Sequence, residues 1–440
     1  MLRQSKALNP TLGAFITITE ESAMAEATAA DQKFASGIDL GPLQGIPYCV
    51  KDNIATKDAP TTANSHVLDR EWGAGWDAPV VARLRAAGAV HMGKTVLSEF
   101  AFGLPDATLG WQVPKNPWNT DYSPAGSSNG TGIAVSAGMV YCGLGTDTGG
   151  SIRQPGSANG HTSIKATFGR VPKSGCAPLG YSLDNIGPHA RSAWDCAAML
   201  TVISGYDSTD LCAAKEPVPD FTAAIDGSVA GMRIGIPSNF FFEVCTPEIA
   251  DAVMNAVDVL KDAGATIVPV YLPHAELAQV AGLITLECEA LAYHLPDLQT
   301  RRFDYGYFCR TGLMRAALYT GSDFVQAQRF RSYWKKAVET ATAGVDVLIT
   351  PTSAAPPPLI ADMHPDSIVV SPTLTFPWNV NGWPAMAVPI GFSAEKHLPL
   401  SMQVVGKAFD EAAIFKVADA YQQLTNWHLQ VPPIAAEVLA

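Results

Sequence analysis

Three short polar stretches carry side chains that are able to do covalent chemistry. Ser151 lies in GTDTGGSIRQPG (145–156), directly after two glycines that let the backbone turn tightly and bring its amide groups close to a ligand. Ser127 and Ser128 lie in a glycine-flanked turn, GSSNG, and Lys51 follows the apolar run YCV. A serine hydroxyl needs an adjacent base to act as a nucleophile. A lysine is such a base only when neutral, a state favoured by burial without a carboxylate partner.

Other active-site motifs fit these stretches less well. GSSNG matches the G-x-S-x-G nucleophile elbow, with Ser128 as nucleophile, but the elbow requires a preceding strand and 119–124 has the composition of a loop. S-x-x-K occurs twice, on polar stretches that begin at Ser332 and Ser393, which is typical of chance. No lysine and Ser/Thr pair follows the glycines as in a phosphate-binding loop. A serine hydrolase with a histidine base remains open, although the sequence nominates no particular histidine.

Metal and cofactor chemistry is not indicated by the sequence. The nine histidines are dispersed, without an H-E-x-x-H motif or an i, i+4 pair. The eight cysteines contain no C-x-x-C pair, which argues against a zinc ribbon or a redox motif. We therefore expect no metal and no cofactor, and free thiols in a cytoplasmic protein.

Charge and hydropathy restrict the class of partner. There are 29 Lys and Arg against 41 Asp and Glu, a net charge of −12, and no basic cluster that would follow a phosphate backbone. We expect no nucleic acid among the partners. The most apolar run, 133–144, is well short of the roughly 20 residues that a bilayer requires. The first residues show no apolar core of a secretory signal, so we expect no membrane association.

The surrounding pattern predicts an α/β fold that positions these residues. Strands are expected at AFITIT, YCV, VYCGLG, VDVLITP, AMAVPIGF and LSMQVVG, with helices after Glu20, Ala78 and Gly130 and at DEAAIFKVADAYQQLTN. Residues 232–270 read as strand, helix, strand, and SLDNIGPHAR as a loop before a helix. We expect one continuous domain, 1–440, consisting of a core (45–200), a mostly helical middle (210–342) broken at Tyr305–Arg310, and C-terminal strands and a helix (343–440) that complete the core.

In these motifs the chain resembles the amidase signature hydrolases. The resemblance rests on PAGSSNGTGIAVSAGMVYCGLGTDTGGSIRQPGSANG, SLDNIGPHARSAWD, GKTVLSEFAFG, NPW, TPTSAAPPP and GWPAMAVPIGF, and spans about Asn9 to Pro432. It implies a large mixed sheet with helices on both faces. It also implies a catalytic triad in which Ser151 is the nucleophile, Ser127 is the serine after a cis peptide bond and Lys51 is the base. The backbone amides of Thr148, Gly149, Gly150 and Ser151 match the family's oxyanion hole.

Neighbouring residues extend this comparison. We expect Ser128, Asp147 and Arg153 to support the site, the carboxylate by ordering the glycine loop and the cation by supporting the serines. The chain departs from the family pattern at four positions: Ala125, Asn129, Asn159 and His161. It also lacks most of the family's first helix before Asn9, which predicts an edge that is bare or covered by a second subunit, with a homodimer as one arrangement.

The substrate is a more open question. Aromatic residues between Phe100 and Trp118, together with Phe376, Trp378 and Trp383, suggest an apolar pocket, and they are equally compatible with the core. The residues predicted to bind substrate are Phe100, Phe102, Leu104, Gly126 and Trp378. We expect a hydrolase that cleaves the C–N bond of small aryl or alkyl amides, and also carbamates (urethanes), through an acyl-enzyme. The alternative is the amidase subunit of a tRNA-dependent amidotransferase, which releases ammonia from glutamine.

Overall fold

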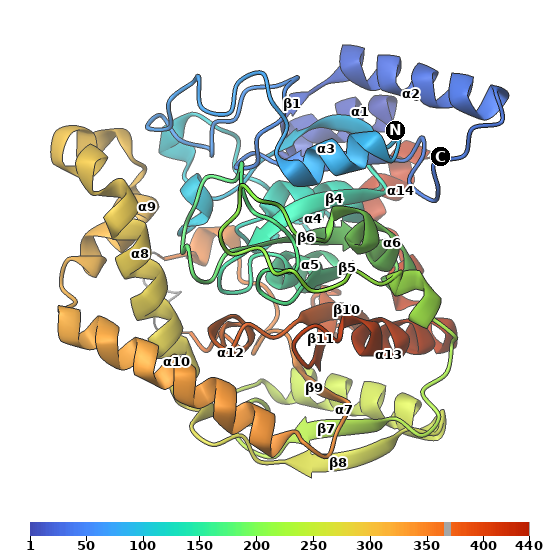
Figure 1. Ribbon diagram of the computed structural model, residues 1–440, viewed down its shortest axis with the longest axis vertical. Coiled ribbons are helices and arrows are strands. Elements are labelled where there is room, and N and C mark those ends of the chain that lie inside the picture. Colours follow the sequence, from blue (N-terminus) through green and yellow to red (C-terminus); the bar gives the residue numbers. More distant parts are fainter. Residues whose placement is uncertain (365–370, 440) are drawn as a thin grey trace.

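The computed structural model describes residues 1–364 and 371–439 (Figure 1). Its strands are β1 (Phe15–Ile18), β2 (Pro47–Lys51), β3 (Val90–Thr95), β4 (Cys142–Asp147), β5 (Thr162–Lys165), β6 (Asn185–Ala190), β7 (Arg233–Pro237), β8 (Thr266–Val270), β9 (Val347–Pro351), β10 (Ala385–Phe392) and β11 (Pro399–Gly406). Within the described residues they form one 11-stranded sheet in the order β1-β3-β2-β4-β6-β5-β10-β11-β9-β7-β8. Parallel pairs such as β2 with β4 alternate with antiparallel pairs such as β10 with β11, so the predicted mixed sheet is confirmed.

Helices lie on both faces of this sheet, as expected. They are α1 (Leu2–Leu12), α2 (Glu20–Ala35), α3 (Pro79–Ala86), α4 (Asn129–Ser136), α5 (Arg153–Asn159), α6 (Ala193–Ile203), α7 (Pro247–Asp262), α8 (Ala278–Arg301), α9 (Tyr307–Ala316), α10 (Gly321–Ala341), α12 (Phe376–Val380), α13 (Glu411–Leu424) and α14 (Pro433–Leu439). Apolar side chains of α3, α6, α7 and α13 form the largest core on one face. Helices α8, α9 and α10 stand together at one side of the molecule (Figure 1).

The alternation of side chains along the strands decides which face carries the polar residues. On β11, Met402 and Val404 enter the core beneath α7 and α13, whereas Gln403 points to the opposite face. On β2, Val50 belongs to the same core, and Cys49 packs with α4 on the other side. Lys51 shares the parity of Cys49. The strand period therefore sends Lys51 and Gln403 to the same face of the sheet.

The last two strands of the chain occupy the middle of the sheet. β10 pairs with β5 and with β11, and β11 pairs with β9. The strands β1 to β6 lie on one side of this pair, and β7 to β9 lie on the other. Residues near 403 therefore reach the site formed by residues near 150.

Two local predictions were wrong. Asn185–Ala190, expected as a loop because of Gly187 and Pro188, is strand β6, which pairs with β4 from Cys142 to Asp147. Gly187 is required there by the close approach of β5, because a Cβ atom would lie 2.3 Å from the carbonyl oxygen of Ile164. Pairing between distant strands thus outweighs the two local breakers.

The amino-terminal edge also differs from the expectation. Residues Leu2–Leu12 form a full helix, α1, whose Leu8 and Leu12 are buried beside Ala435 of α14. The edge is therefore covered by the chain's own C-terminal helix. The expected break at Tyr305–Arg310 is shorter than predicted, because α9 already begins at Tyr307. All eight cysteines are free, and none of the described helices is long and apolar enough to cross a membrane.

Candidate active site

Lys51 is the last residue of β2 and is completely buried. Its Nζ donates hydrogen bonds to Ser127 Oγ at 2.8 Å and to Thr146 Oγ1 at 2.6 Å. Among the described residues, no carboxylate forms an ion pair with it. Burial lowers the pKa of Lys51 from 10.5 to about 7, so a large fraction of the side chain is neutral near neutral pH.

The two serines lie at the start of α4. The peptide bond between Gly126 and Ser127 is cis, and Ser127 is 3% exposed. The amide of Ser128 donates to the carbonyl oxygen of Ser151 at 3.3 Å, which joins this turn directly to the glycine loop. The hydroxyl of Ser128 donates to the carbonyl oxygen of Thr146 and accepts from its amide, each at 3.2 Å. Ser128 therefore attaches α4 to β4 and does not face Lys51.

Asp147 orders the glycine loop, which follows β4. Its carboxylate accepts the amide of Gly150 at 2.9 Å and the amide of Ile152 at 3.3 Å. Arg153 donates to the same carboxylate through Nε and through a terminal nitrogen, both at 3.0 Å. Burial raises the pKa of Asp147, but the Arg153 guanidinium outweighs burial and holds it at about 2. The carboxylate thus fixes the conformation that brings Ser151 to its position.

Arg153 links this loop to distant parts of the chain. Its remaining hydrogen bonds run to the carbonyl oxygen of Thr375, to Gln403 Oε1 on β11 and to Asn379 Oδ1 on α12. We expected this cation to support the serines. Its side-chain partners are instead Asp147 and these residues, so it acts on Ser151 only through the loop.

The glycines of the loop are required by packing. A Cβ atom on Gly149 would lie 2.5 Å from the ring of Phe376, and one on Gly150 would lie 2.1 Å from Thr375 Oγ1. Gly150 also has a φ of +137°, which an L side chain rarely adopts. Thr375 Oγ1 in turn donates to the carbonyl oxygen of Gly149 at 2.6 Å. The segment before α12 therefore presses directly on the loop that carries Ser151.

A cavity of about 550 Å³ opens onto both serines. Ser127 and Ser151 lie in its wall, together with Thr148 and Gly149 of the glycine loop. The wall contains three of the residues predicted to bind substrate: Phe102, Leu104 and Gly126. Phe376 lines it as well, and with Leu179, Leu286 and Val244 makes much of the surface apolar.

Phe100 and Trp378 do not line this cavity, which corrects two of the predictions. Phe100 is buried and packs edge-on against His294. Trp378 is completely buried and stacks on Phe241, and Trp383 belongs to the same apolar cluster. These rings are core residues because α12 turns them away from the cavity, a direction that composition alone does not reveal.

Charge is scarce in the cavity wall. Among the described residues that line it, the one ionisable side chain is Asp362, which is exposed. No lysine, arginine or histidine belongs to that described lining. Such a wall suits an uncharged ligand, because a buried charge requires a partner of opposite sign.

One wall of the cavity is held by a buried carboxylate. Glu99 accepts hydrogen bonds from Ser65 Oγ at 2.5 Å and from the amide of Gly306, just before α9, at 2.8 Å. Asp106 accepts the amide of Tyr307 at 2.7 Å. The residues between these carboxylates, 101–105, line the cavity. Burial raises the pKa of Glu99 to about 7.

A comparison with known proteins identifies the family. The amidase family model matches residues 1–415. The chain belongs to the amidase signature family. A glutamyl-tRNA(Gln) amidotransferase subunit of Roseiflexus sp. (strain RS-1) is 38% identical over 463 residues, which cover 99% of this chain and 94% of the relative.

Solved structures of amidase signature enzymes are also similar. Native peptide amidase from Stenotrophomonas maltophilia is 31% identical, with a TM-score of 0.84, and covers 98% of this chain and 93% of its own. A chain from a vestigial protein complex that reveals the origins of an s-triazine catabolic enzyme is 30% identical, with a TM-score of 0.89, over 96% of this chain and 93% of that one. The amidase signature fold is therefore shown for nearly the whole chain.

The departures from the amidase signature pattern have local explanations. Ala125 has a φ of +55°, a conformation that explains why glycine is common at this position. Asn129 donates to the carbonyl oxygen of Ala125, and Asn159 donates to those of Pro124 and Pro155. The Nε2 of His161 lies 2.9 Å from Nδ1 of His189, both rings being buried. These residues stabilise the turns around the serines.

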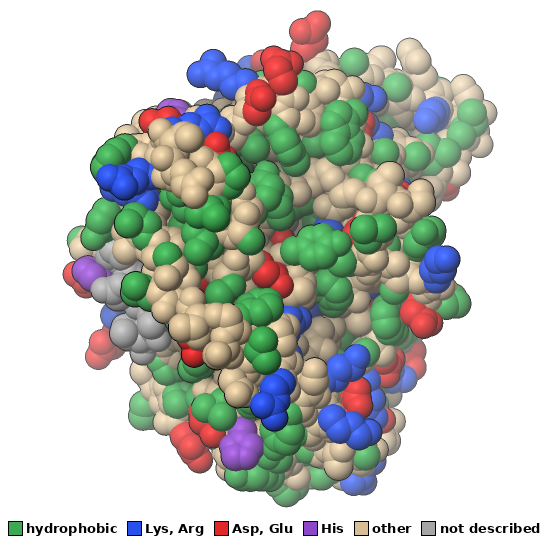
Figure 2. Space-filling view, turned by 60° about the vertical axis from the view of Figure 1, so that its left-hand side comes forward, with side chains coloured by type: hydrophobic (Ala, Val, Ile, Leu, Met, Phe, Trp, Pro, Cys, Tyr) green, Lys and Arg blue, Asp and Glu red, His purple; other side chains and the backbone are tan. Residues whose placement is uncertain are grey.

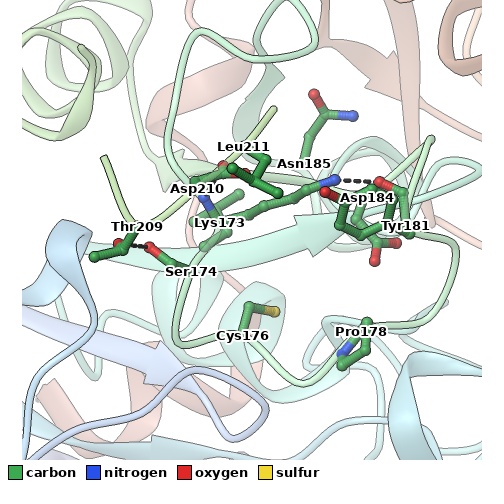
Figure 3. A pocket seen from close by; sticks show the side chains of 11 residues that line it. Lys173, Ser174, Cys176, Pro178, Tyr181, Asp184, Asn185, Thr209, Asp210 and Leu211 are labelled. Carbon is green, nitrogen blue, oxygen red and sulfur yellow. Dashed lines mark hydrogen bonds between the residues drawn. The ribbon is translucent and has the colours of Figure 1, made fainter. Parts of the chain in front are cut away.

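A second cavity, of about 270 Å³, contains neither serine of the site (Figure 3). Figure 3 shows Lys173 reaching the carbonyl oxygen of Tyr181, and Ser174 bonded to Thr209 at 2.7 Å. Asp184, in its wall, accepts the hydroxyl of Thr148. This cavity therefore borders the support of the amidase oxyanion loop.

Sequence reasoning missed four residues of this amidase site. Thr146 contacts Lys51, and Thr375, Asn379 and Gln403 hold Arg153. Thr146 lies inside the glycine motif, where its position on the strand beside Lys51 was a usable signal. The other three lie more than 220 residues from Arg153 and have no local signal.

Proposed function

We propose that this chain hydrolyses carbon–nitrogen amide bonds through an acyl-enzyme on Ser151, with Lys51 and Ser127 as a proton relay. The observation that carries the proposal is the contact of Lys51 Nζ with Ser127 Oγ at 2.8 Å, within a buried site that lowers the pKa of Lys51 to about 7. A neutral lysine accepts a proton, and Ser127 and Ser151 share one cavity wall.

Acylation proceeds in two proton transfers. Ser151 Oγ forms a bond to the amide carbon while its proton passes to Ser127, whose own hydroxyl proton moves to Lys51. The tetrahedral oxyanion accepts hydrogen bonds from amides of residues 148–151, and loss of one such donor costs about 3–4 kcal/mol of transition-state stabilisation. The C–N bond then breaks, and the leaving nitrogen takes the proton back from the relay.

Deacylation repeats these steps with water. Water loses a proton to the Ser127–Lys51 relay and attacks the ester carbon, and the Ser151 oxygen leaves and recovers the proton. The products are a carboxylic acid and an amine or ammonia. Asp147 and Arg153 keep the glycine loop in position throughout, without exchanging protons with the substrate.

We infer an uncharged small amide as the substrate, with an aryl or alkyl group on the apolar wall. The lining by Phe102, Leu104 and Phe376, and the absence of cations from the described part of the wall, support this assignment. Carbamates carry the same uncharged carbonyl. The relatives and solved structures named above carry amidotransferase, amidase and s-triazine names, so they do not support urethane cleavage.

The second candidate is the release of ammonia from glutamine as the amidase subunit of an amidotransferase. The relative from Roseiflexus, at 38% identity over 99% of this chain, favours it more directly than any relative favours the first candidate. The cavity is less favourable, because the α-carboxylate of glutamine would meet no cation among the described lining residues.

A matched pair of substrates separates the two candidates. Butanamide carries the terminal carboxamide of glutamine without its amino and carboxylate groups. Ammonia release from each is measured with the purified chain alone. We expect kcat/KM for butanamide to exceed that for glutamine by at least tenfold, and preference for glutamine would reject the uncharged substrate. Loss of both activities in Ser151→Ala tests the shared mechanism.

A further inference from the structure

Helix α9 is apolar on two opposite faces. Its inner face buries Cys309, Leu313 and Ala316. Phe303, Tyr307, Met314 and Leu318 follow one another at spacings of 4, 7 and 4 residues, which places them on one stripe outside the molecule, and they are 74%, 53%, 53% and 80% exposed. A helix that is apolar all round is normally covered on all sides. The outer stripe is therefore unusual for a surface that contacts only water.

This outer stripe, defined by Phe303, Tyr307, Met314 and Leu318, lies within a basic segment. Residues 302–318 contain three arginines and one acidic residue, Asp304. The guanidinium groups of Arg302 and Arg310 lie 4.8 Å and 5.3 Å from the centre of the Phe303 ring.

The acidic groups around the stripe are mostly engaged elsewhere. Asp297 pairs with Arg301, Glu287 pairs with Arg315, and Asp106 accepts the amide of Tyr307. Figure 2 looks onto the side of the molecule that α8, α9 and α10 form, where apolar side chains are spread among cationic ones. The stripe thus offers apolar side chains with an excess of positive charge.

We propose that the outer stripe of α9 is the docking site for an apolar helix of a different polypeptide that carries carboxylates on its flanks. The carboxylates would face Arg302 and Arg310 while apolar side chains cover Phe303 and Leu318. Because Glu99 and Asp106 bind the start of α9, the partner would contact the helix that holds one wall of the active-site cavity.

Charge argues against a second copy of this chain as the occupant. A two-fold axis that matched Phe303 with Leu318 and Tyr307 with Met314 would bring the two copies of Arg310 together at the centre. Like charges at an interface centre are unfavourable. A partner with carboxylates at that point removes the conflict.

The test uses two labelled helical peptides with leucines at positions i, i+3, i+4 and i+7. One carries glutamates on both flanks of the leucines, and the other carries lysines. Binding to the full chain is measured by fluorescence anisotropy. We expect the glutamate peptide to bind at least tenfold more tightly than the lysine peptide, and Arg310→Glu to reverse this preference.

Exposed leucines supply the matched control. Leu318→Glu lies on the stripe, and Leu429→Glu lies on the short helix Trp427–Leu429, where that leucine is 62% exposed. We expect the first variant to weaken glutamate-peptide binding at least tenfold and the second to leave it unchanged. Equal binding of the two peptides, or absence of binding, overturns the proposal. A dimer of the unmodified chain that Leu318→Glu dissociates, seen by light scattering, would identify a second copy as the occupant instead. None of these readouts depends on amide turnover.

Discussion

The pH dependence of amide hydrolysis provides a sharp test of Lys51. With a pKa of about 7 rather than 10.5, about half of the side chain is neutral at pH 7, an increase on the order of a thousandfold. Only the neutral form accepts the proton of Ser127, so kcat/KM should rise tenfold per pH unit at low pH. The rise should have its midpoint near pH 7 and level off above about pH 8.

Thr146→Val shifts this midpoint in a direction set by the structure. Thr146 Oγ1 accepts a hydrogen bond from Lys51 Nζ at 2.6 Å, and this bond stabilises the charged lysine. Hydrogen bonds to charged groups contribute about 1.5–3 kcal/mol, which corresponds to about 1–2 pH units. We therefore expect the midpoint to fall to about pH 5–6. Valine has nearly the same shape as threonine, so the cavity is preserved.

Two control variants distinguish the titration of Lys51 from that of a nearby carboxylate. Glu99 titrates in the same range, its pKa being raised by burial to about 7, and its ionisation would also change with rising pH. Glu99→Gln should keep the midpoint near pH 7 if Lys51 is the base. Thr342→Val removes a buried hydroxyl that bonds only within α10 and should leave the profile unchanged. The assay is kcat/KM for one uncharged amide from pH 5 to 9.

A rate that is flat from pH 6 to 9 would refute a lysine base with a lowered pKa. A midpoint that stays in place in Thr146→Val but moves in Glu99→Gln would assign the titration to the carboxylate instead.

Three further predictions address the nucleophile, the loop and the cavity. Ser151→Ala should lower turnover at least about a thousandfold with unchanged circular dichroism, and retention of more than a few per cent of activity would remove Ser151 as nucleophile. Asp147→Asn leaves the buried Arg153 without its countercharge and should cost about 3–5 kcal/mol in urea unfolding, whereas a loss below 1 kcal/mol would contradict the assigned role. Phe102→Ala should raise KM for an aryl amide severalfold, whereas Trp378→Ala should mainly lower stability, by about 3–5 kcal/mol in the same unfolding assay. A larger KM change in Trp378→Ala would return that ring to the cavity.

Local sequence is informative where chemistry and strand end coincide. Lys51, Ser127 and Ser151 were predicted from residue type, flanking glycines and family motifs, and the structure brings Lys51 to Ser127 and both serines to one cavity. The roles of these residues remain predictions. The mixed sheet with helices on both faces followed from the same resemblance and is confirmed.

Tertiary pairing explains what could not be predicted. The strand β6 contains Gly187 and Pro188, which locally predict a loop, and only its pairing with β4 makes it a strand. The aromatic residues Phe102 and Trp378 have the same chemistry, but one lines the cavity and the other fills the core. Which side a ring faces is set by elements hundreds of residues away.

The central position of β10 and β11 has a consequence for how the protein is made. Strands that end the chain are needed to join β5 to β9, so both of these edges stay unpaired on the ribosome until about residue 406 has emerged. Unpaired strand edges are templates for aggregation. Gln403, which anchors Arg153, also arrives only then. A nascent chain therefore holds all three triad residues long before it is able to hold the glycine loop in place, and it stays dependent on protection during that interval.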